Sequence, residues 1–441
     1  MIKVDKIISA TWIYTGEDQD KVLFDHSIVV SDQKIRDIQP TIKAHEMYEA
    51  EETYQLSDHI LLPGLINSHT HSAMSLLKGY ADDLQLETWL NDYIWPAESK
   101  FVNYDFVLDG SELAIAEMIK GGTTTFNDMY FFPEATAKAV ENLSIRANIG
   151  LVVMEFPSNY ANDPQEYLNK GFEFRDNWRN NKLISTSIAP HAPYSVSNST
   201  FELINTYAEQ LNLTIHTHLH ETRNEIEESI KQFSSTPIER LSELGLLGPK
   251  LMAAHCVHLS ENDMYQLKSN GVSVLCNISS NMKLGSGFVD VYQLINNNIN
   301  IAIGTDSSAS NNRLDMFSEM RSMALNNKAL TMKSEFLKPS EVLKMATING
   351  AKALGLDHII GSIVKNKYAD IIAVNLDRID TQPCYDPLAS LVYCADRSSV
   401  EYVWINGDTK LKERVLVDID ENEILQKVKS WKNKINKINQ T

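Results

Sequence analysis

Short apolar runs alternate with amphipathic stretches along most of the chain. Eight runs have the length and the Val and Ile content of buried strands, and they lie at residues 60–67, 123–128, 146–153, 184–189, 213–218, 251–256, 272–277 and 299–305. Between them, apolar residues recur at helical spacing, for example at 104–120, 201–211, 261–270 and 314–330. This order predicts a parallel sheet, and eight units favour a closed α/β barrel of the (β/α)8 type. An open doubly wound sheet is the alternative, but its Gly-rich turn after the first strand is absent.

The two ends of the chain have a different pattern. Residues 7–14 and 26–30 near the start, and 362–376 and 400–417 near the end, alternate apolar and polar side chains as β-strands do. The dipeptide Asn406-Gly407 has the sequence of a two-residue hairpin turn. We expect a small β region at each end, and the two regions can join. Residues 421–441 predict an amphipathic helix.

Composition limits the class of protein. The hydrophobic content of 43% is ordinary for a globular protein, and no apolar run reaches the roughly 18 residues of a membrane-spanning helix. Asp5 and Lys6 interrupt the region where a secretory signal would be apolar, so we expect a cytoplasmic protein. The formal net charge of −18 repels phosphates and argues against nucleic-acid binding. Four cysteines without a C-x-x-C pair predict reduced thiols.

Two histidines, His69 and His71, follow the first apolar run of the barrel pattern. Because side chains alternate along a strand, both point to the same side. Two imidazole nitrogens at adjacent inward positions supply half of a tetrahedral zinc shell. An H-x-H pair also occurs as two unrelated histidines, so the motif needs support from other strands.

The fifth run contains His216, His218 and His220, which share one face by the same alternation. One of them is enough to bind a metal, and the spacing does not say which; a core position or a place behind the ligands is expected for at least one neighbour. Glu221 has the opposite parity. It can still reach the barrel mouth if the strand bends at the rim, and a solvated surface position is the alternative.

Three further residues lie near the ends of other runs. Asp306 follows the eighth run, where a buried carboxylate is costly unless a cation lies nearby; a helix cap is the alternative. His191 follows the fourth run and His255 lies on the sixth. Runs one, four, five, six and eight therefore each offer a polar group near the C-terminal end of a strand, where barrel active sites form. The pattern predicts a metal site at this rim.

Five segments of the chain resemble motifs of the amidohydrolase superfamily, in particular its 5′-methylthioadenosine/S-adenosylhomocysteine deaminase branch. They are PGLINSHTH at 63–71, HLHET at 218–222, AAHCVH at 253–258, SNMKLGSG at 280–287 and GTDSSASNN at 304–312. The resemblance covers nearly the whole chain. It implies a metal-dependent barrel domain at 60–359 and a composite β-sandwich domain, with a C-terminal helix, built from 1–59 and 360–441.

The resemblance also implies the metal ligands His69, His71, His218 and Asp306. His218 is chosen among the three histidines because the family's H-x-x-E pattern matches it together with Glu221. Binuclear relatives bridge two metals with a carboxylated lysine on the fourth strand, but 146–153 and 184–191 contain no lysine. One divalent ion is expected. Zn²⁺ is the first choice, although nitrogen and oxygen ligands also accept iron, manganese or nickel.

The activity that the resemblance implies is hydrolytic deamination, in which a C–N bond of an adenine ring is cleaved. The metal lowers the pKa of water from about 15.7 toward 7 and so provides hydroxide at neutral pH. Hydroxide would attack C6, with Asp306 and His255 taking or orienting its proton and Glu221 protonating the ring nitrogen. The products would be the inosine derivative and ammonia.

Residues for the rest of the substrate follow from the same resemblance. It places Glu98 on the ribose hydroxyls, His191 at the nucleoside and Trp89 at the border of the pocket; packing within a helix is the alternative for Trp89. Arg146 matches one family arginine that holds the homocysteine carboxylate, whereas 148–151 lacks the second. A bidentate guanidinium contact is hard to replace. We therefore expect weaker use of S-adenosylhomocysteine than of methylthioadenosine or adenosine.

Two other interpretations stay open. The same fold and metal could act on another amino- or chloro-substituted heterocycle, such as guanine or a triazine, or the barrel could be a catalytically inactive scaffold. Glu98 with Arg146 favours a nucleoside, and the complete ligand set argues against an inactive barrel. The cytidine-deaminase type of zinc enzyme needs a P-C-x-x-C pair that this chain lacks. The expected partner is a small purine nucleoside, not nucleic acid or membrane, and homo-oligomers are left open.

Overall fold

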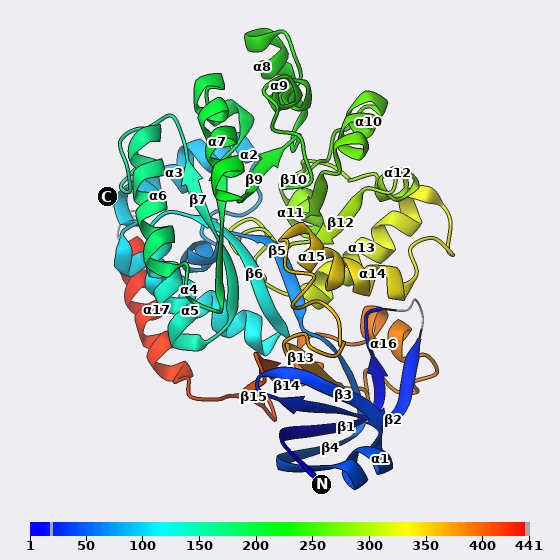
Figure 1. Cartoon of the computed structure of the whole chain (residues 1–441). Coiled ribbons are helices and arrows are strands. Elements are labelled where there is room, and N and C mark those ends of the chain that lie inside the picture. Colours follow the sequence, from blue (N-terminus) through cyan, green and yellow to red (C-terminus); the bar gives the residue numbers. More distant parts are fainter. Residues whose placement is uncertain (18–20, 437–441) are drawn as a thin grey trace. The chain divides into compact units, whose positions relative to one another are not determined.

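The computed structural model describes residues 1–17 and 21–436 of the chain (Figure 1). Contacts divide it into two compact units. The first contains Met1–Asn67, Glu117–Thr125 and Asp315–Ile419, and the second contains Ser68–Ala116, Phe126–Leu314 and the residues from Asp420 onward. None of the described helices is both long and apolar enough to cross a membrane.

Eight strands form a sheet in which each strand pairs with the next along the chain. They are β5 (Leu65–Thr70), β6 (Thr123–Tyr130), β7 (Arg146–Val153), β8 (Ile184–Pro190), β9 (Thr214–Leu219), β10 (Leu251–His255), β11 (Ser273–Cys276) and β12 (Asn300–Ile303). Pairing from β7 to β12 is parallel. The ring is nearly closed because the Asp306 N–H, just beyond β12, donates to the His69 carbonyl on β5 at 2.9 Å. The predicted (β/α)8 barrel is confirmed.

Helices connect the barrel strands as the apolar spacing predicts. They are α4 (Tyr104–Lys120), α5 (Pro133–Leu143), α6 (Pro164–Trp178), α7 (Asn198–Leu211), α8 (Arg223–Phe233), α9 (Pro237–Glu243), α10 (Glu261–Asn270), α11 (Ile278–Lys283) and α12 (Val291–Asn296). Figure 1 shows α5 and α6 outside β6 and β7. Asp163, Ser197 and Ser260 begin three of these helices by accepting a backbone N–H with their side chains, which satisfies otherwise orphaned donors.

Shorter helical segments lie between β5 and α4, and a further one follows β8. The segments between β5 and α4 are η1 (Ser72–Leu77), α2 (Leu86–Thr88), the π-helical η2 (Trp89–Ile94) and α3 (Trp95–Phe101). The segment after β8 is η3 (Pro193–Ser195). Buried side chains of η1, η2 and α3 belong to one apolar cluster, which includes Met74, Trp89 and Ala97. The chain after β5 is therefore packed and does not form an open loop.

The first barrel strand differs from its prediction at 60–67. Residues up to Pro63 end β4 (Tyr48–Pro63), which belongs to the other sheet, and β5 starts at Leu65. The change occurs at Gly64, where a Cβ atom would lie only 2.1 Å from Thr124 Oγ1. A side chain at position 64 would therefore collide with Thr124, and glycine is the residue that fits where the apolar run passes from one sheet to the other.

The second sheet combines strands from both ends of the chain in the order β16-β15-β14-β13-β4-β1-β2-β3. Its strands are β1 (Ile2–Tyr14), β2 (Val22–Ser31), β3 (Lys34–Pro40), β4, β13 (Ile371–Asn375), β14 (Val400–Ile405), β15 (Asp408–Lys412) and β16 (Val415–Leu416). The ends join through antiparallel pairing of β4 with β13. Asn406 and Gly407 form the predicted two-residue turn, both with positive φ.

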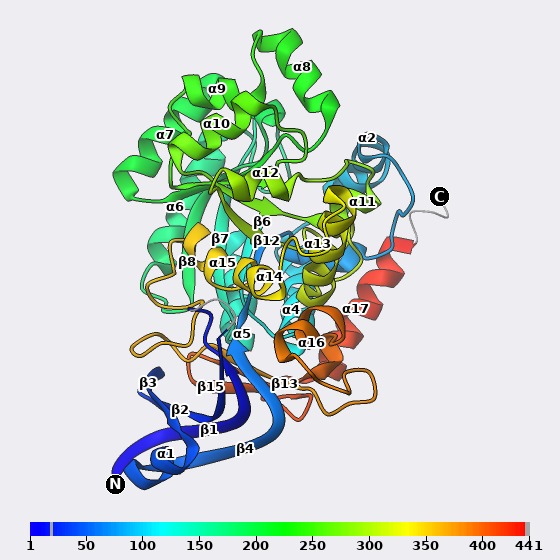
Figure 2. The same ribbon diagram turned by 90° about the vertical axis from the view of Figure 1, so that its right-hand side faces the viewer.

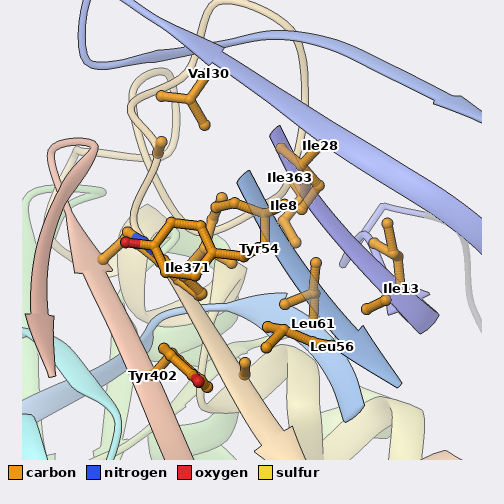
Figure 3. Packing of buried hydrophobic residues seen from close by; sticks show 14 of the residues in the cluster. Ile8, Ile13, Ile28, Val30, Tyr54, Leu56, Leu61, Ile363, Ile371 and Tyr402 are labelled. Carbon is orange, nitrogen blue, oxygen red and sulfur yellow. The ribbon is translucent and has the colours of Figure 1, made fainter. Parts of the chain in front are cut away.

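The first unit also contains several helices. They are α1 (Thr41–Met47), α13 (Met316–Thr331), α14 (Pro339–Met345), α15 (Ile348–Ala353), α16 (Pro387–Tyr393) and η4 (Arg397–Ser399). An apolar core holds its terminal strands together (Figure 3). Ile8, Ile28 and Leu61 come from the N-terminal strands, and Ile371 and Tyr402 come from the C-terminal ones. The predicted joining of the two β regions is therefore a consequence of shared hydrophobic burial.

The C-terminal helix α17 (Glu421–Asn436) groups with the second unit and not with the terminal sheet. Trp431 Nε1 donates to Asp109 Oδ2 at 2.8 Å, and its ring lies edge-on to Phe106 of α4. Figure 2 shows α17 beside α4. The part of the predicted helix at 437–441 lies outside the described residues. The domain limits proposed from the sequence, 1–59 with 360–441 and 60–359, remain a proposal. The contact-based units differ from them at this helix and at residues 60–67, 117–125 and 315–359, which group with the terminal strands.

Candidate metal centre and active site

Four side chains from three different strands face one another in the second unit. His71 Nε2 lies 3.3 Å from Asp306 Oδ1 and 3.2 Å from His218 Nε2, and His69 Nε2 lies 3.4 Å from the same carboxylate oxygen. The candidate ligand atoms of His69, His71 and Asp306 all lie within 4.8 Å of one another, as do those of His69, His218 and His255. The predicted ligands are therefore brought together at the C-terminal ends of β5, β9 and β12.

Contacts behind the ligands orient the imidazole rings. His71 Nδ1 lies 2.6 Å from the Met129 carbonyl, and His218 Nδ1 lies 2.6 Å from the His191 carbonyl. Because a carbonyl oxygen only accepts, both Nδ1 atoms carry the proton and both Nε2 lone pairs are left for a metal. His69 Nδ1 lies 2.8 Å from His216 Nε2, so His216 has the supporting role.

The carboxylate of Asp306 is oriented in the same way. Ser280 and Ser310 donate hydrogen bonds to Oδ2 at 2.6 and 2.8 Å, which leaves Oδ1 facing the histidines. His69 Nε2 is fully buried and forms no hydrogen bond within the described part of the chain. An orphaned buried nitrogen is costly, and a cation bound to it removes the cost.

The charge state of two of the three histidines also fits a metal, whereas at His71 burial is outweighed by the hydrogen bond with Asp306, which raises the pKa of His71. Burial lowers the pKa of His69 to about 4 and the pKa of His218 well below its usual value. Both rings are therefore neutral at physiological pH, as ligation requires. Three imidazoles and one carboxylate match the nitrogen and oxygen donors that Zn²⁺ accepts. The residues present fit one divalent ion.

Two further ionisable groups adjoin the ligands. Glu221 Oε2 lies 3.8 Å from His255 Nε2, and Ser286 donates to Glu221 Oε1 at 3.3 Å. His255 Nδ1 lies 2.8 Å from Asn281 Oδ1, which leaves Nε2 facing the glutamate. Burial raises the pKa of Glu221, so its protonated form persists closer to neutral pH.

Glu221 reaches this position because the chain turns sharply after β9. His220 has a φ of 53°, which breaks the strand alternation that would point Glu221 outward. Glu225 stabilises the turn: its Oε1 accepts the His220 N–H at 3.1 Å and its Oε2 accepts the Glu221 N–H at 2.8 Å. The expectation that Glu221 reaches the mouth despite its parity is consistent with this turn.

A cavity of about 660 Å³ opens onto the ligands. Most of its wall is apolar, formed by Met74, Leu86, Trp89, Leu90, Ile94, Trp95, Val102, Met129, Phe131, Val152, Met154, Phe156, Pro157 and Leu284. The remaining lining is polar or ionisable and includes Glu98, Tyr130, His191, Glu221 and His255. Among the residues that the structure describes, neither a lysine nor an arginine lines the cavity. The cavity therefore suits a largely uncharged ligand that meets a few polar groups.

Three of the predicted substrate residues line this cavity. Trp89 is 5% exposed and also packs among apolar residues such as Ile94, so the pocket and the packing interpretations both hold. Glu98 on α3 accepts a hydrogen bond from Tyr130, and burial raises the pKa of Glu98 to about 7. His191 Nδ1 lies 3.0 Å from Ser195 Oγ, and burial lowers its pKa to about 3.

Arg146 is not among the described residues that line the cavity, and its contact with the substrate stays a prediction. It begins β7, whose other end contributes Val152 to the cavity, and six strand residues span about 20 Å. Its guanidinium is buried and donates to the Lys182 carbonyl at 3.0 Å. The sequence match places the residue correctly on a strand but at the end opposite the site.

Sequence reasoning missed Tyr130, Glu225, Ser280 and Ser310. Tyr130 ends β6 as other site residues end their strands, so its position was a usable signal. The two serines lie in the segments 280–287 and 304–312 that carry the family resemblance, but a serine alone gives no chemical indication. Glu225 is recognisable only when the turn after β9 is known.

Comparison with known proteins agrees with this geometry. The sequence model of the Amidohydrolase family matches residues 60–410, and the chain belongs to this family. A 5-methylthioadenosine/S-adenosylhomocysteine deaminase from Teredinibacter turnerae is 40% identical over 435 residues, covering 98% of both chains. A 5′-deoxyadenosine deaminase from Methanosphaera stadtmanae is 41% identical over 91% of this chain and 93% of its own. The crystal structure of an adenosine deaminase from Xanthomonas campestris with bound zinc has a TM-score of 0.97 and 41% identity, covering 99% of both chains.

Proposed function

We propose that the chain is a metal-dependent aminohydrolase that converts adenosine-type nucleosides to inosine derivatives and ammonia. The observation that carries the proposal is the convergence of three histidines and Asp306 with Glu221 and His255 on one apolar cavity. The relatives named above as deaminases of methylthioadenosine, S-adenosylhomocysteine or 5′-deoxyadenosine support the nucleoside class.

His69, His71, His218 and Asp306 would hold one Zn²⁺ ion. The ion supplies acidification of water, so that hydroxide is available near neutral pH. His255 and Asp306 orient the attacking water and take its proton. Asp306 is itself a proposed ligand, and His255 lies beside the ligands His69 and His218. Attack at C6 of the purine forms a C–O bond. The proton taken from water then passes to the amino group, and departure of ammonia breaks the C–N bond.

Glu221 donates a proton to the ring nitrogen next to C6 as negative charge develops there. Its raised pKa keeps the acid form available, and Ser286 together with the turn after β9 fixes its direction. Proton donation and metal binding are assigned to different side chains. Loss of the Glu221 carboxyl should therefore affect the rate without removing the metal.

The lining of the cavity supports a preference for nucleosides with an uncharged 5′ group. S-Adenosylhomocysteine carries a carboxylate in its amino-acid part, and the lining, as far as residues 1–17 and 21–436 form it, offers this group no lysine or arginine. Glu98, Glu221 and Asp306 also line the cavity, and none of them gives this carboxylate a positively charged partner. Methylthioadenosine, 5′-deoxyadenosine and adenosine carry no carboxylate, and their 5′ groups can meet apolar side chains such as Phe131 and Met154.

Absorbance assays on adenosine, methylthioadenosine, S-adenosylhomocysteine, guanine and an aminotriazine, combined with metal analysis of the same preparation, test the proposal. We expect ammonia release with the three nucleosides and a kcat/KM for S-adenosylhomocysteine at least about tenfold below that for methylthioadenosine, as loss of a charge-assisted contact implies. Equal kcat/KM values would contradict the preference. Turnover of guanine or the triazine alone would favour the second candidate, and retained metal without any turnover would favour an inactive scaffold.

A further inference from the structure

We infer that Tyr130 is a positioning residue that makes the enzyme dependent on the ribose diol, by aiming the carboxylate of Glu98 into the cavity. The inference rests on the proposed function, since it assumes a nucleoside substrate. It adds a specificity-determining residue on β6 that does not touch the metal ligands.

The contact between the two residues is short and buried. Tyr130 Oη donates to Glu98 Oε1 at 2.6 Å, and both residues line the cavity. Tyr130 is 6% exposed, and its ring belongs to the apolar cluster that includes Ile94 and Ala97 of the neighbouring helical segments. The ring is therefore held by packing, and its hydroxyl is a fixed donor to one oxygen of the carboxylate.

The other carboxylate oxygen is available to a ligand. Within residues 1–17 and 21–436, no hydrogen bond or ion pair reaches Glu98 Oε2. A carboxylate in an apolar cavity needs donors, and adjacent ribose hydroxyls supply two O–H groups at the spacing of two carboxylate oxygens. A 2′,3′-diol therefore completes the hydrogen bonding that Tyr130 begins.

The backbone of Glu98 is held separately from its side chain. Asn159 Nδ2 donates to the carbonyls of Ser99 and Val102 at 2.9 and 3.0 Å and also reaches the Glu98 carbonyl at 3.4 Å. Removal of the Tyr130 hydroxyl should leave α3 in place while the Glu98 side chain gains rotamers. Selective loss of diol recognition, rather than general disruption, is the expected result.

The charge of Glu98 depends on the same contact. Burial raises its pKa to about 7, and the hydrogen bond from Tyr130 works in the opposite direction. Without this donor, a larger fraction of Glu98 would be protonated at neutral pH. A protonated carboxyl is a weaker acceptor for two hydroxyls, so positioning and charge act together.

The test compares adenosine with 2′,3′-dideoxyadenosine in the wild type and in Tyr130→Phe. The substitution keeps the packed ring and removes only the donor. We expect kcat/KM for adenosine to fall at least about tenfold, mainly through KM, with little change for the dideoxy substrate. Inhibition constants of inosine and 2′,3′-dideoxyinosine should shift in the same way and require no turnover.

Two further variants make the result specific. Tyr167→Phe is the matched control, because Tyr167 donates to Ser158 behind the same cavity wall and does not touch Glu98. We expect it to leave the adenosine-to-dideoxyadenosine ratio unchanged. In a Glu98→Gln background, Tyr130→Phe should cause no additional loss of the ratio, because both residues act through one contact.

Equal losses for both substrates in Tyr130→Phe, or a full further loss in the Glu98→Gln background, would overturn the inference. Failure of the wild type to deaminate adenosine at all would instead reject the proposed function. The two failures are therefore distinguishable in one set of assays.

Discussion

His255 Nε2 and Glu221 Oε2 lie 3.8 Å apart, although they follow different barrel strands. The proposed base and the proposed acid thus face the space that the candidate metal ligands line. Asn281 holds the histidine from behind, and backbone amides bonded to Glu225 hold the glutamate. Proton transfer from water to the ring nitrogen requires two such groups in reach of one substrate.

Removal of one metal ligand should remove the metal and the activity together. In His218→Ala, one of the four convergent donors is lost while Met129 and Ser280 still hold the others. We expect metal content, measured by plasma mass spectrometry, to fall well below one equivalent, and deamination to disappear. The exposed His358 provides the control, since His358→Ala should keep both. Full metal occupancy in His218→Ala would exclude His218 as a ligand.

Glu221→Gln should separate chemistry from metal binding. The amide keeps the size of the side chain but has no acidic proton, so kcat should fall at least about 10²-fold, a typical contribution of a general acid. Metal content should stay at the wild-type level. Glu227→Gln, on the exposed face of α8, is the matched control and should retain full activity. A fully active Glu221→Gln enzyme would remove this residue from the mechanism.

Glu225→Gln should lower kcat through the position of Glu221. An amide offers one acceptor oxygen to the two N–H groups that the carboxyl now accepts, and its NH₂ group faces a donor. We expect kcat to fall about tenfold with metal retained, and the free energy of unfolding to fall by about 1–3 kcal/mol. Steady-state kinetics and denaturant unfolding check both values. Wild-type kcat and stability would show that the turn does not need this side chain.

The stability gap between wild type and Glu225→Gln should depend on pH. Burial raises the folded-state pKa of Glu225 to about 7, above the roughly 4.3 of an unfolded glutamate. The folded state therefore binds the proton more tightly, and this contribution is present below about pH 4.3 and lost as pH rises through 7. The glutamine variant has no such titration. The difference in free energy of unfolding between wild type and Glu225→Gln, measured with denaturant, should therefore be larger at pH 5 than at pH 8. A difference that grows with pH would contradict the raised pKa.

Gly304→Ala should disturb the metal centre by crowding. A Cβ atom there would lie 2.6 Å from Asn277 Oδ1 and 2.7 Å from the backbone nitrogen of His69. We expect a stability loss of about 1–3 kcal/mol, as overpacking causes, with weaker metal retention because His69 must shift. Gly248→Ala is the control, because nothing lies within 4 Å of a Cβ atom at that position. Equal thermal stability and metal content in the two variants would refute the close approach.

The sequence alone determined most of the scaffold and the candidate metal ligands. The apolar runs at 146–153 and 251–256 correspond to β7 and β10, and the helix predicted at 104–120 is α4 with the same limits. Strand alternation placed His69 and His71 on one side, where their rings meet at 4.9 Å. These features follow from local periodicity, which a single segment already contains.

Only the tertiary structure decided the features that depend on neighbours from other segments. One apolar run is divided between two sheets at Gly64, where Thr124 packs closely against the backbone. Glu221 reaches the site through a turn that Glu225 stabilises. Tyr130 donates a hydrogen bond to Glu98, which lies on a different element of the cavity wall. The donor that a side chain meets, and the turn that the chain makes after a strand, are set by packing between distant parts of the chain, and alternation within one strand carries no information about them.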